Sequence, residues 1–204
     1  MRKSAEEARR TRERIVGAAV HQASGAGLTG LTIGSLASAL EMSKAGVVGP
    51  FGSRAELQLA TLDRAVQMFT AAVVAPGRAA DPGLPCLNAV IDAWCAYLAD
   101  SPFPNGCFVT AASCELDGQP GELRNKVQEA VTRWRHFLAD QVAAASATGD
   151  LAPDLEPGDL VSTLSGLAMT ANQEIQLLGD RDAALRARRL MHAAVALHRP
   201  RPTI

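Results

Sequence analysis

The chain has 204 residues, of which 48% are apolar, and a formal net charge of −1 at pH 7. This composition can fill a continuous core, and it excludes an intrinsically disordered chain or a collagen-like repeat. Apolar-leaning runs such as 138–147 are shorter than the roughly 20 residues that cross a bilayer, and Met1–Arg14 is too charged for a signal peptide. We therefore expect a cytoplasmic protein with no membrane partner.

Charge is divided unevenly along the chain. Residues 1–64 hold nine Lys and Arg against six Asp and Glu, a net of +3, so the remaining residues carry −4. A basic amino-terminal third followed by an acidic remainder favours a segment that binds a polyanion and a body with another task. Short basic segments are often only solvated, so the sequence motifs must decide whether this one binds a polyanion or is simply exposed to water.

Apolar residues recur at three- and four-residue spacing along almost the whole chain, which predicts an all-α protein. The first helix is expected over Ser4–Ala23, before a glycine-rich segment that ends it. Thr32 is a candidate N-cap for a short helix, Ile33–Leu40. Ser43 is a second cap candidate. The helix that it opens cannot pass Pro50, because proline disfavours helix in the preceding residue and lacks a backbone donor.

A longer helix is expected over Arg54–Val74. The next segment, Ala75–Gly83, holds several helix breakers and predicts a linker. Five further helices are expected after it: Leu84–Asp100, Gly106–Leu116, Gly121–Thr148, Pro157–Leu178 and Asp182–His198.

The two short helices over Thr32–Gly49 form a helix-turn-helix pattern. Ala37 is small where the helices must approach, and Val47 can pack the second helix back. The exposed face of Ser43–Gly49 would then enter the major groove of DNA, while hydroxyl, amide and charged groups meet phosphates. The candidate DNA contacts are Thr32, Ser43, Lys44, Ala45, Gly46, Val48 and Arg54. A helical hairpin with no DNA partner stays open as the alternative.

Several spaced motifs agree with one family. They are Arg14-Ile15-Val16-x-Ala18-Ala19, Gly27-Leu28-x-x-Leu31-Thr32-Ile33-x-x-Leu36-Ala37, Met42-Ser43-Lys44-x-Gly46-Val47 and Phe51-Gly52-Ser53-Arg54-x-Glu56-Leu57. Over about Thr11–Asp63 the chain resembles the N-terminal domain of TetR-type transcriptional regulators. Two later motifs resemble one branch of that family more loosely: Phe103-Pro104-x-Gly106-Cys107-Phe108 and Glu115-x-Asp117-Gly118-x-Pro120-Gly121.

The resemblance implies a homodimer that binds a palindromic operator in double-stranded DNA through two recognition helices. It also implies a body that binds a small-molecule effector, of unidentified chemistry, which weakens DNA binding. We accordingly expect a helix-turn-helix DNA-binding domain over residues 1–53 and a helical ligand-binding and dimerisation domain over residues 54–204.

The sequence departs from the family's pattern where it would touch DNA. Val48 stands where the family usually has an aromatic residue, often a tyrosine whose hydroxyl reaches a phosphate, and Pro50 replaces a residue that continues the recognition helix. Arg54 takes the usual lysine position. Glu41 occupies a turn position where glycine is common, and a left-handed backbone there would cost about 1–2 kcal/mol. Each lost phosphate contact would flatten the salt dependence of binding by about one unit of slope.

Aromatic residues are concentrated over Leu84–Thr148, where a pocket of bundle type would be apolar with a few polar anchors. Two amides further on, in an otherwise apolar helix, need partners if they are buried. The candidate ligand-binding residues are Trp94, Tyr97, Phe108, Trp134, Asn172 and Gln173. The alternatives are that the aromatic residues only form the core and that a dimer interface satisfies the amides.

The helices expected over Pro157–Leu178 and Asp182–His198 carry apolar stripes. The resemblance implies that these last two helices form a four-helix dimer interface. The candidate interface residues are Leu160, Leu164, Leu167, Ala171, Leu185, Arg189 and His192.

The sequence holds no HExxH, Glu-x-x-His, GxSxG or phosphate-loop motif, so we expect neither an enzyme nor a cofactor. None of the four histidines has a partner four residues away, which argues against a helical metal site. The four cysteines form no CxxC pair and are expected to be reduced and buried. A redox-sensing pair of Cys107 and Cys114, seven residues apart on one helix face, is the alternative hypothesis.

The sequence thus predicts a ligand-responsive repressor that binds its operator as a homodimer. The alternative hypothesis is a TetR-shaped protein that binds small molecules and whose operator recognition is weakened or lost through Val48 and Pro50.

Overall fold

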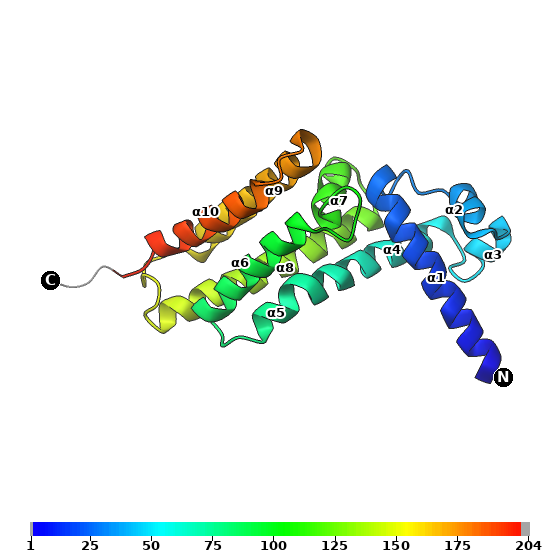
Figure 1. Cartoon of the computed structure of the whole chain (residues 1–204). Coiled ribbons are helices and arrows are strands. Elements are labelled where there is room, and N and C mark those ends of the chain that lie inside the picture. The colour runs from blue at the N-terminus through cyan, green and yellow to red at the C-terminus, as the bar shows by residue number, and fades with distance from the viewer. Residues whose placement is uncertain (1, 201–204) are drawn as a thin grey trace. The chain divides into compact units, whose positions relative to one another are not determined.

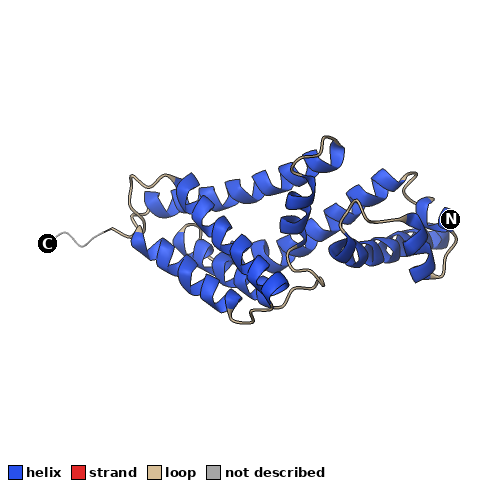
Figure 2. Ribbon diagram, turned by 90° about the horizontal axis from the view of Figure 1, so that it is seen from above, coloured by secondary structure: helices blue, strands red, loops and turns tan. Residues whose placement is uncertain are grey.

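The computed structural model describes residues 2–200. All regular secondary structure in that part of the chain is helical, and no strand occurs in it (Figure 2). The prediction of an all-α fold is therefore confirmed. None of these helices is both long enough and apolar enough to span a membrane.

The first helix, α1 (Arg2–Ala26), is longer than expected. Its inner face buries Ile15 fully. The helix continues through the glycine-rich segment and ends at Gly27, whose φ is +80° and whose N–H donates to the carbonyl of Ala23 at 2.8 Å. Gly27 follows the last turn of the helix and has the left-handed backbone that glycine adopts freely, so the helix ends there. Gly25 does not have this conformation and remains within the helix.

Three helices follow α1 along the chain (Figure 1): α2 (Ile33–Leu40), α3 (Lys44–Val48) and α4 (Arg54–Phe69). The first two agree with the predicted short helices, and α3 stops before Pro50 as expected. They share a core with α1 whose side chains are at most 1% exposed: Ile15, Leu28, Leu31, Leu36, Val47, Leu57 and Leu62. Removing each such side chain from water stabilises the fold by about 1.5–3 kcal/mol.

Helix α4 passes without a break into a π-helical turn, η1 (Thr70–Val74), and then into α5 (Ala75–Arg78). The predicted linker, which began at residue 75, is therefore wrong over its first four residues, where the chain stays helical. In the π-turn the N–H of Ala75 donates to the carbonyl of Thr70, five residues back. This wider turn accommodates Pro76, which has no N–H of its own to donate.

The later helices lie within two residues of their predicted bounds. They are α6 (Leu84–Ala99), α7 (Phe108–Leu116), α8 (Glu122–Ala147), α9 (Pro157–Leu178) and α10 (Ala183–Leu197). A second core joins α6, α8, α9 and α10 through side chains that are at most 2% exposed: Leu87, Ile91, Leu98, Leu138, Leu160, Leu164 and Met191.

The chain separates into two compact units. Unit 1 contains the residues up to Met68 together with Phe103–Ala130, and unit 2 contains Phe69–Pro102 together with the residues from Val131 on. Helix α7 therefore belongs to the same unit as α1, α2 and α3. A compact unit is not by itself a functional domain, so the division into 1–53 and 54–204 stays a prediction.

Burial separates the four cysteines. Cys86, Cys95 and Cys107 are buried as expected, but the expectation is wrong for Cys114, which lies exposed on α7. Burial raises the pKa of the Cys95 thiol to about 11, with the Asp92 carboxylate adding to the rise and Arg188 opposing it. Burial also raises the pKa of the Cys86 thiol.

Candidate functional site

Helices α2 and α3 each begin with the predicted side-chain cap. The Oγ1 of Thr32 accepts a hydrogen bond from the N–H of Ser35 at 3.1 Å, and the Oγ of Ser43 accepts one from the N–H of Gly46 at 3.0 Å. Each cap satisfies a donor that the first turn of a helix leaves unpaired. The two caps therefore fix where the chain turns on either side of the corner.

The corner itself is a left-handed residue. Glu41 has φ +53° and ψ +42°, and it is the one non-glycine residue with positive φ among residues 2–200. The N–H of Met42 donates to the carbonyl of Ala37 at 2.9 Å, which closes the end of α2. The chain thus makes the tight turn without the usual glycine and accepts the backbone strain that a side chain brings at this position.

Helix α3 is anchored by one side chain and presents its first turn to solvent. Val47 is fully buried, whereas Ser43, Lys44 and Ala45 are exposed. Val48 is half-buried, and its carbonyl accepts the N–H groups of the two residues after Pro50, which ends the helix. The remaining predicted contacts in this corner are Thr32, which is exposed, and Gly46, which is half-buried.

Arg54, a further predicted DNA contact, is held by unit 1 itself. Its Nε donates to the carbonyl of Leu31 at 2.9 Å, and its terminal nitrogen donates to the carbonyl of Thr29. The side chain is nevertheless exposed. Its charge can act on a nearby phosphate, but two of its donors already stabilise the segment before α2.

Three of the predicted ligand-binding residues gather in unit 2. The ring of Trp134 meets those of Trp94 and Phe69 edge-on at 5.0 Å, and Tyr97 meets Phe69 at 5.4 Å. Phe69, which stands immediately before the π-turn, was not among the predicted ligand-binding residues. Trp94 is 6% exposed, and its indole N–H is a buried donor without an acceptor in the described part of the chain.

The other three predicted ligand-binding residues lie elsewhere. Phe108 belongs to unit 1, where its ring meets that of Phe103 at 5.6 Å. Asn172 is half-buried on α9, and its neighbour Gln173 is exposed. Gln173 therefore does not need a partner inside its own chain.

The predicted interface residues fall into two groups. Leu160, Leu164 and Ala171 are buried inside unit 2 and have no surface left for a second chain. Leu185 and Arg189 are exposed, while Leu167 and His192 are partly covered. Among the side chains that the structure describes, the large apolar ones left most exposed all lie on α9 and α10: Met169, Leu177, Leu178, Leu185, Leu190 and Leu197.

His192 takes part in a polar cluster that joins α10 to α6. The Oδ1 of Asp92 accepts hydrogen bonds from Arg188 Nε and from His192 Nε2, each at 2.7 Å, and the Nδ1 of His192 lies 3.2 Å from the Oδ1 of Asn88. Partial burial raises the pKa of Asp92, but the hydrogen bonds from Arg188 and His192 outweigh it and hold that pKa below its ordinary value. Within residues 2–200, no three His, Cys, Asp or Glu side chains are grouped as a metal site requires.

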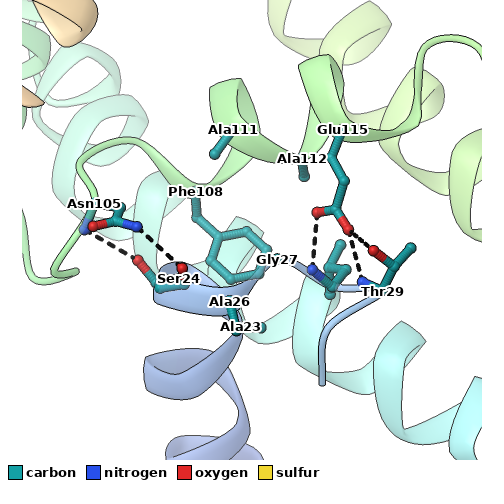
Figure 3. Close-up of a pocket in the computed structure, with 12 residues that line it drawn as sticks. Ala23, Ser24, Ala26, Gly27, Thr29, Asn105, Phe108, Ala111, Ala112 and Glu115 are labelled. Atoms are coloured by element: carbon teal, nitrogen blue, oxygen red, sulfur yellow. Dashed lines mark hydrogen bonds between the residues drawn. The ribbon is translucent and has the colours of Figure 1, made fainter. Parts of the chain in front are cut away.

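Unit 1 also holds a cavity that was not predicted from the sequence. Its volume is about 310 Å³, and it lies between the end of α1 and the segment that carries Asn105, Phe108 and Glu115 (Figure 3). The two looser motifs noted above, around Phe103 and Glu115, supply these residues. Those two motifs were the only features of the sequence that pointed to this cavity, and they did not indicate that the residues would contact the end of α1.

Two short helices, α2 and α3, join at a tight turn, bury Leu36 and Val47 and leave the first turn of α3 exposed. In a protein whose regular structure is helical throughout residues 2–200, this arrangement defines a helix-turn-helix protein. The family model described as tetracyclin repressor-like, C-terminal domain, matches residues 83–191, which is more than half of the chain. The chain therefore belongs to the TetR family of transcriptional regulators.

Solved structures share the fold over nearly the whole chain. A TetR transcriptional regulator from Chloroflexus aurantiacus J-10-FL is 22% identical, with a TM-score of 0.87 over 97% of this chain and 98% of that one. A TetR-family regulator from Cytophaga hutchinsonii is 18% identical, with a TM-score of 0.83 over 96% and 98%. AibR in complex with isovaleryl coenzyme A and operator DNA is 18% identical, with a TM-score of 0.71 over 93% and 98%. No curated protein matches the chain.

Proposed function

We propose that the chain is a ligand-responsive repressor that binds a palindromic DNA operator as a homodimer. The observation that carries this proposal is the exposed first turn of α3, a helix that is held against the core by the fully buried side chain of Val47. The first residues of the second helix in a helix-turn-helix are the ones that meet base edges in the major groove. Ser43, Lys44 and Ala45 occupy that position.

The remaining predicted DNA contacts surround this turn. Thr32 offers a hydroxyl to a phosphate, Gly46 lets the DNA backbone approach closely, and Lys44 supplies charge. AibR, which has the same fold, was solved with operator DNA, and this supports operator binding by the fold. Arg54 acts mainly by holding the segment before α2, because its guanidinium already donates to Leu31.

The proposed homodimer uses the surface of α9 and α10. Met169, Leu177, Leu185 and Leu190 leave at least 42% of their surface exposed. Apolar side chains gathered on two neighbouring helices mark an interface between proteins, and an isologous dimer covers the same patch on both copies. Two copies joined in this way present two α3 helices to the two halves of a palindrome.

The proposed effector site is the aromatic cluster of unit 2, which consists of Phe69, Trp94, Tyr97 and Trp134. The buried indole N–H of Trp94 has no acceptor among residues 2–200, and a native protein seldom leaves such a donor unpaired. We expect an effector with an apolar body and a hydrogen-bond acceptor that this N–H can reach. AibR, solved with isovaleryl coenzyme A, is a protein of this fold that holds a small molecule.

Fluorescence anisotropy tests DNA binding directly. The purified protein is titrated into a labelled duplex from immediately upstream of its coding region, across a salt series, with an unrelated duplex of equal length as the control. Specific binding that weakens steeply with salt supports the proposal, because each neutralised phosphate contributes about one unit to the slope. Equal, weak binding to both duplexes contradicts it for this operator and calls for selection from random duplexes.

Intrinsic fluorescence tests the effector site. Trp94 and Trp134 are the two tryptophans of the chain, and their rings are in contact, so a molecule that enters the cluster changes the emission. An effector must both change this emission and weaken binding to the upstream duplex. A compound that does only the first binds without regulating.

Three departures from the family's pattern favour a second candidate function, a TetR-shaped protein that binds small molecules with weakened operator recognition. Val48 offers no hydroxyl, Pro50 shortens α3, and the carboxylate of Glu41 is exposed at the corner and repels phosphates. The anisotropy experiment separates the two functions, because the second predicts weak binding with little or no preference for the upstream duplex over the unrelated one.

A further inference from the structure

The turn that joins α1 to α2, residues 27–31, is held by a carboxylate from α7. Glu115 accepts the N–H of Leu28 at 2.9 Å on one oxygen and the N–H of Thr29 at 2.7 Å on the other, and the hydroxyl of Thr29 also donates to it (Figure 3). Thr29 and Glu115 are 86 residues apart in the sequence. Hydrogen bonds to a charged acceptor are stronger than those between neutral groups, so this long-range contact holds the turn firmly.

The carboxylate fits closely against the turn. A Cβ added at Gly27 would lie 2.9 Å from both oxygens of Glu115, and the φ of Gly27 is +80°. The backbone conformation therefore favours glycine here, and a side chain at this position would push the carboxylate away from the turn. The two backbone N–H groups and Gly27 together form a cradle that the carboxylate of Glu115 fills.

Helix α4 holds the same turn through its carbonyl groups. Gln58 donates to the carbonyl of Leu28 at 2.6 Å, and Arg54 donates to those of Thr29 and Leu31. Two N–H groups of the turn, those of Leu28 and Thr29, are thus bound by α7, and three of its carbonyls are bound by α4. The next residue, Thr32, is the N-cap of α2, so the position of the turn sets where α2 begins.

A second contact lies beside the first. The side-chain amide of Asn105 donates to the carbonyl of Gly25 at 3.3 Å, and its backbone N–H donates to the hydroxyl of Ser24 at 3.4 Å. Figure 3 shows the ring of Phe108 between Asn105 and Glu115. The segment before α7 therefore contacts the end of α1, and α7 itself contacts the turn that follows α1; all of these residues belong to unit 1.

We propose that Glu115 is a positioning residue for operator binding: its carboxylate holds the α1–α2 turn so that α2 and α3 keep the orientation that the operator requires. This inference rests on the proposed function, and it gives α7 a part in DNA recognition although it lies outside the helix-turn-helix sequence. Glu115 itself touches no DNA in this scheme.

The direction in which DNA affinity changes when Glu115 is replaced distinguishes a positioning role from simple charge repulsion. A carboxylate in a unit that binds a polyanion repels it, so loss of its charge alone would strengthen binding to any duplex. Loss of a positioning contact does the opposite and weakens specific binding, because fewer molecules have the competent orientation.

The variant Glu115→Gln keeps the shape of the side chain but turns an NH₂ toward one of the N–H groups of the turn. We expect the amides of Leu28 and Thr29 to exchange with deuterium at least about tenfold faster, because each loses a charge-assisted hydrogen bond. Amides of α9 and α10 should keep their exchange rates. Asp117→Asn is the matched control, since it removes the same charge from an exposed carboxylate two residues away.

The same variants are then titrated with the upstream and unrelated duplexes used above. We expect Glu115→Gln to bind the upstream duplex about tenfold more weakly. It should bind the unrelated duplex no more weakly than the wild-type protein, and Asp117→Asn should not lose affinity for either. Far-UV circular dichroism shows that the variant is folded. Thr29→Val, which removes the hydroxyl donor alone, should give a smaller change in the same direction.

Unchanged exchange at Leu28 and Thr29 in Glu115→Gln overturns the proposal whatever the DNA result. Faster exchange with equal or tighter binding to the upstream duplex overturns the positioning role. If the wild-type protein distinguishes no duplex, the proposed function fails and the positioning role fails with it. The exchange rates then still show whether Glu115 holds the turn.

Discussion

Arg54 donates a hydrogen bond from Nε to the carbonyl oxygen of Leu31 at 2.9 Å, and this contact ties the start of α4 to the residue before the cap of α2. A second nitrogen of the same guanidinium donates to the carbonyl of Thr29. The planar fork of arginine can serve two such acceptors at once, whereas the ammonium of lysine acts as a single point charge. Arginine in place of the family's usual lysine is thus explained by a contact inside the protein.

Arg54→Lys separates this structural role from a phosphate contact. We expect the free energy of unfolding to fall by about 1 kcal/mol, because the carbonyls lose well-placed donors. Urea unfolding followed by circular dichroism measures the change, with Arg64→Lys on the exposed face of α4 as the control. Unchanged stability together with altered DNA affinity would assign Arg54 to DNA instead.

Val48→Tyr restores the residue type that the family's pattern has at the end of α3. If α3 is aligned with the major groove, the new hydroxyl reaches a phosphate, and binding to the upstream duplex becomes tighter with a salt slope steeper by about one unit. Val48→Phe adds a ring without the hydroxyl and should not steepen the slope. An equal effect of both variants would show that ring packing, not a phosphate contact, changes the affinity.

Local signals in the sequence were sufficient for the corner. Thr32 and Ser43 are followed three residues later by the N–H groups that they cap, and Pro50 ends α3 by chemistry that depends on the residue alone. The bounds of α2 and the end of α3 could therefore be predicted from short windows. The helical continuation through Pro76 could not, because it depends on a π-turn whose hydrogen bonds the composition does not reveal.

Long-range contacts were beyond the sequence pattern. The carboxylate of Glu115 and the N–H of Thr29 are 86 residues apart, and no periodicity relates them. The apolar stripe of α9 was visible, but a stripe does not say what covers it. Leu164 is covered by its own chain, whereas Met169 remains exposed.

Thiol labelling should separate the cysteines by exposure. We expect iodoacetamide to modify Cys114 in the folded protein and to leave Cys95 unmodified, because the buried thiol, with its pKa raised to about 11, is protonated at neutral pH. Mass spectrometry counts the labels, and Cys114→Ser should remove the one expected. A second label on Cys107 in the folded protein would show that both thiols are accessible and would support the hypothesis that Cys107 and Cys114 form a redox-sensing pair.

The Asp92 cluster predicts a stability difference that depends on pH. The pKa of Asp92 is lowered in the folded protein, so its ionised form stabilises the fold above the unfolded pKa, and this stability is lost as the pH falls through the folded pKa. Asp92→Asn should lower the free energy of unfolding at pH 7 by about 0.5–1 kcal/mol, a small effect because the partly exposed pair is screened by solvent.

The difference between Asp92→Asn and the wild-type protein should shrink as the pH falls and disappear below the lowered pKa that Asp92 has in the folded protein, where the carboxyl group is protonated in both states. Urea unfolding at a series of pH values measures it. Asp140→Asn, an exposed carboxylate of the same unit, is the control. A difference that persists at acid pH would mean that Asp92 contributes through packing and not through charge.

The dimer interface can be tested by placing a charge on the exposed apolar surface. Leu185→Glu and Met169→Glu each put a carboxylate where the proposed dimer excludes water, and an unpaired buried charge is strongly unfavourable. We expect the double variant to sediment as a folded monomer of 21.4 kDa, and to bind the upstream duplex more weakly because one α3 at a time meets its half-site. Gln119→Glu, which adds the same charge to an exposed site of unit 1, should leave the dimer intact.

Leu164→Ala distinguishes core residues from interface residues on the same helix. Leu164 is fully buried in its own protomer, so its truncation should lower the free energy of unfolding by about 2–5 kcal/mol through cavity formation. Since Leu164 offers no surface to a second copy, the sedimentation of the folded variant should still be that of a dimer. A monomeric but fully stable Leu164→Ala would place Leu164 in the interface. A wild-type protein that sediments as a monomer at micromolar concentration would contradict the proposed dimer as a whole.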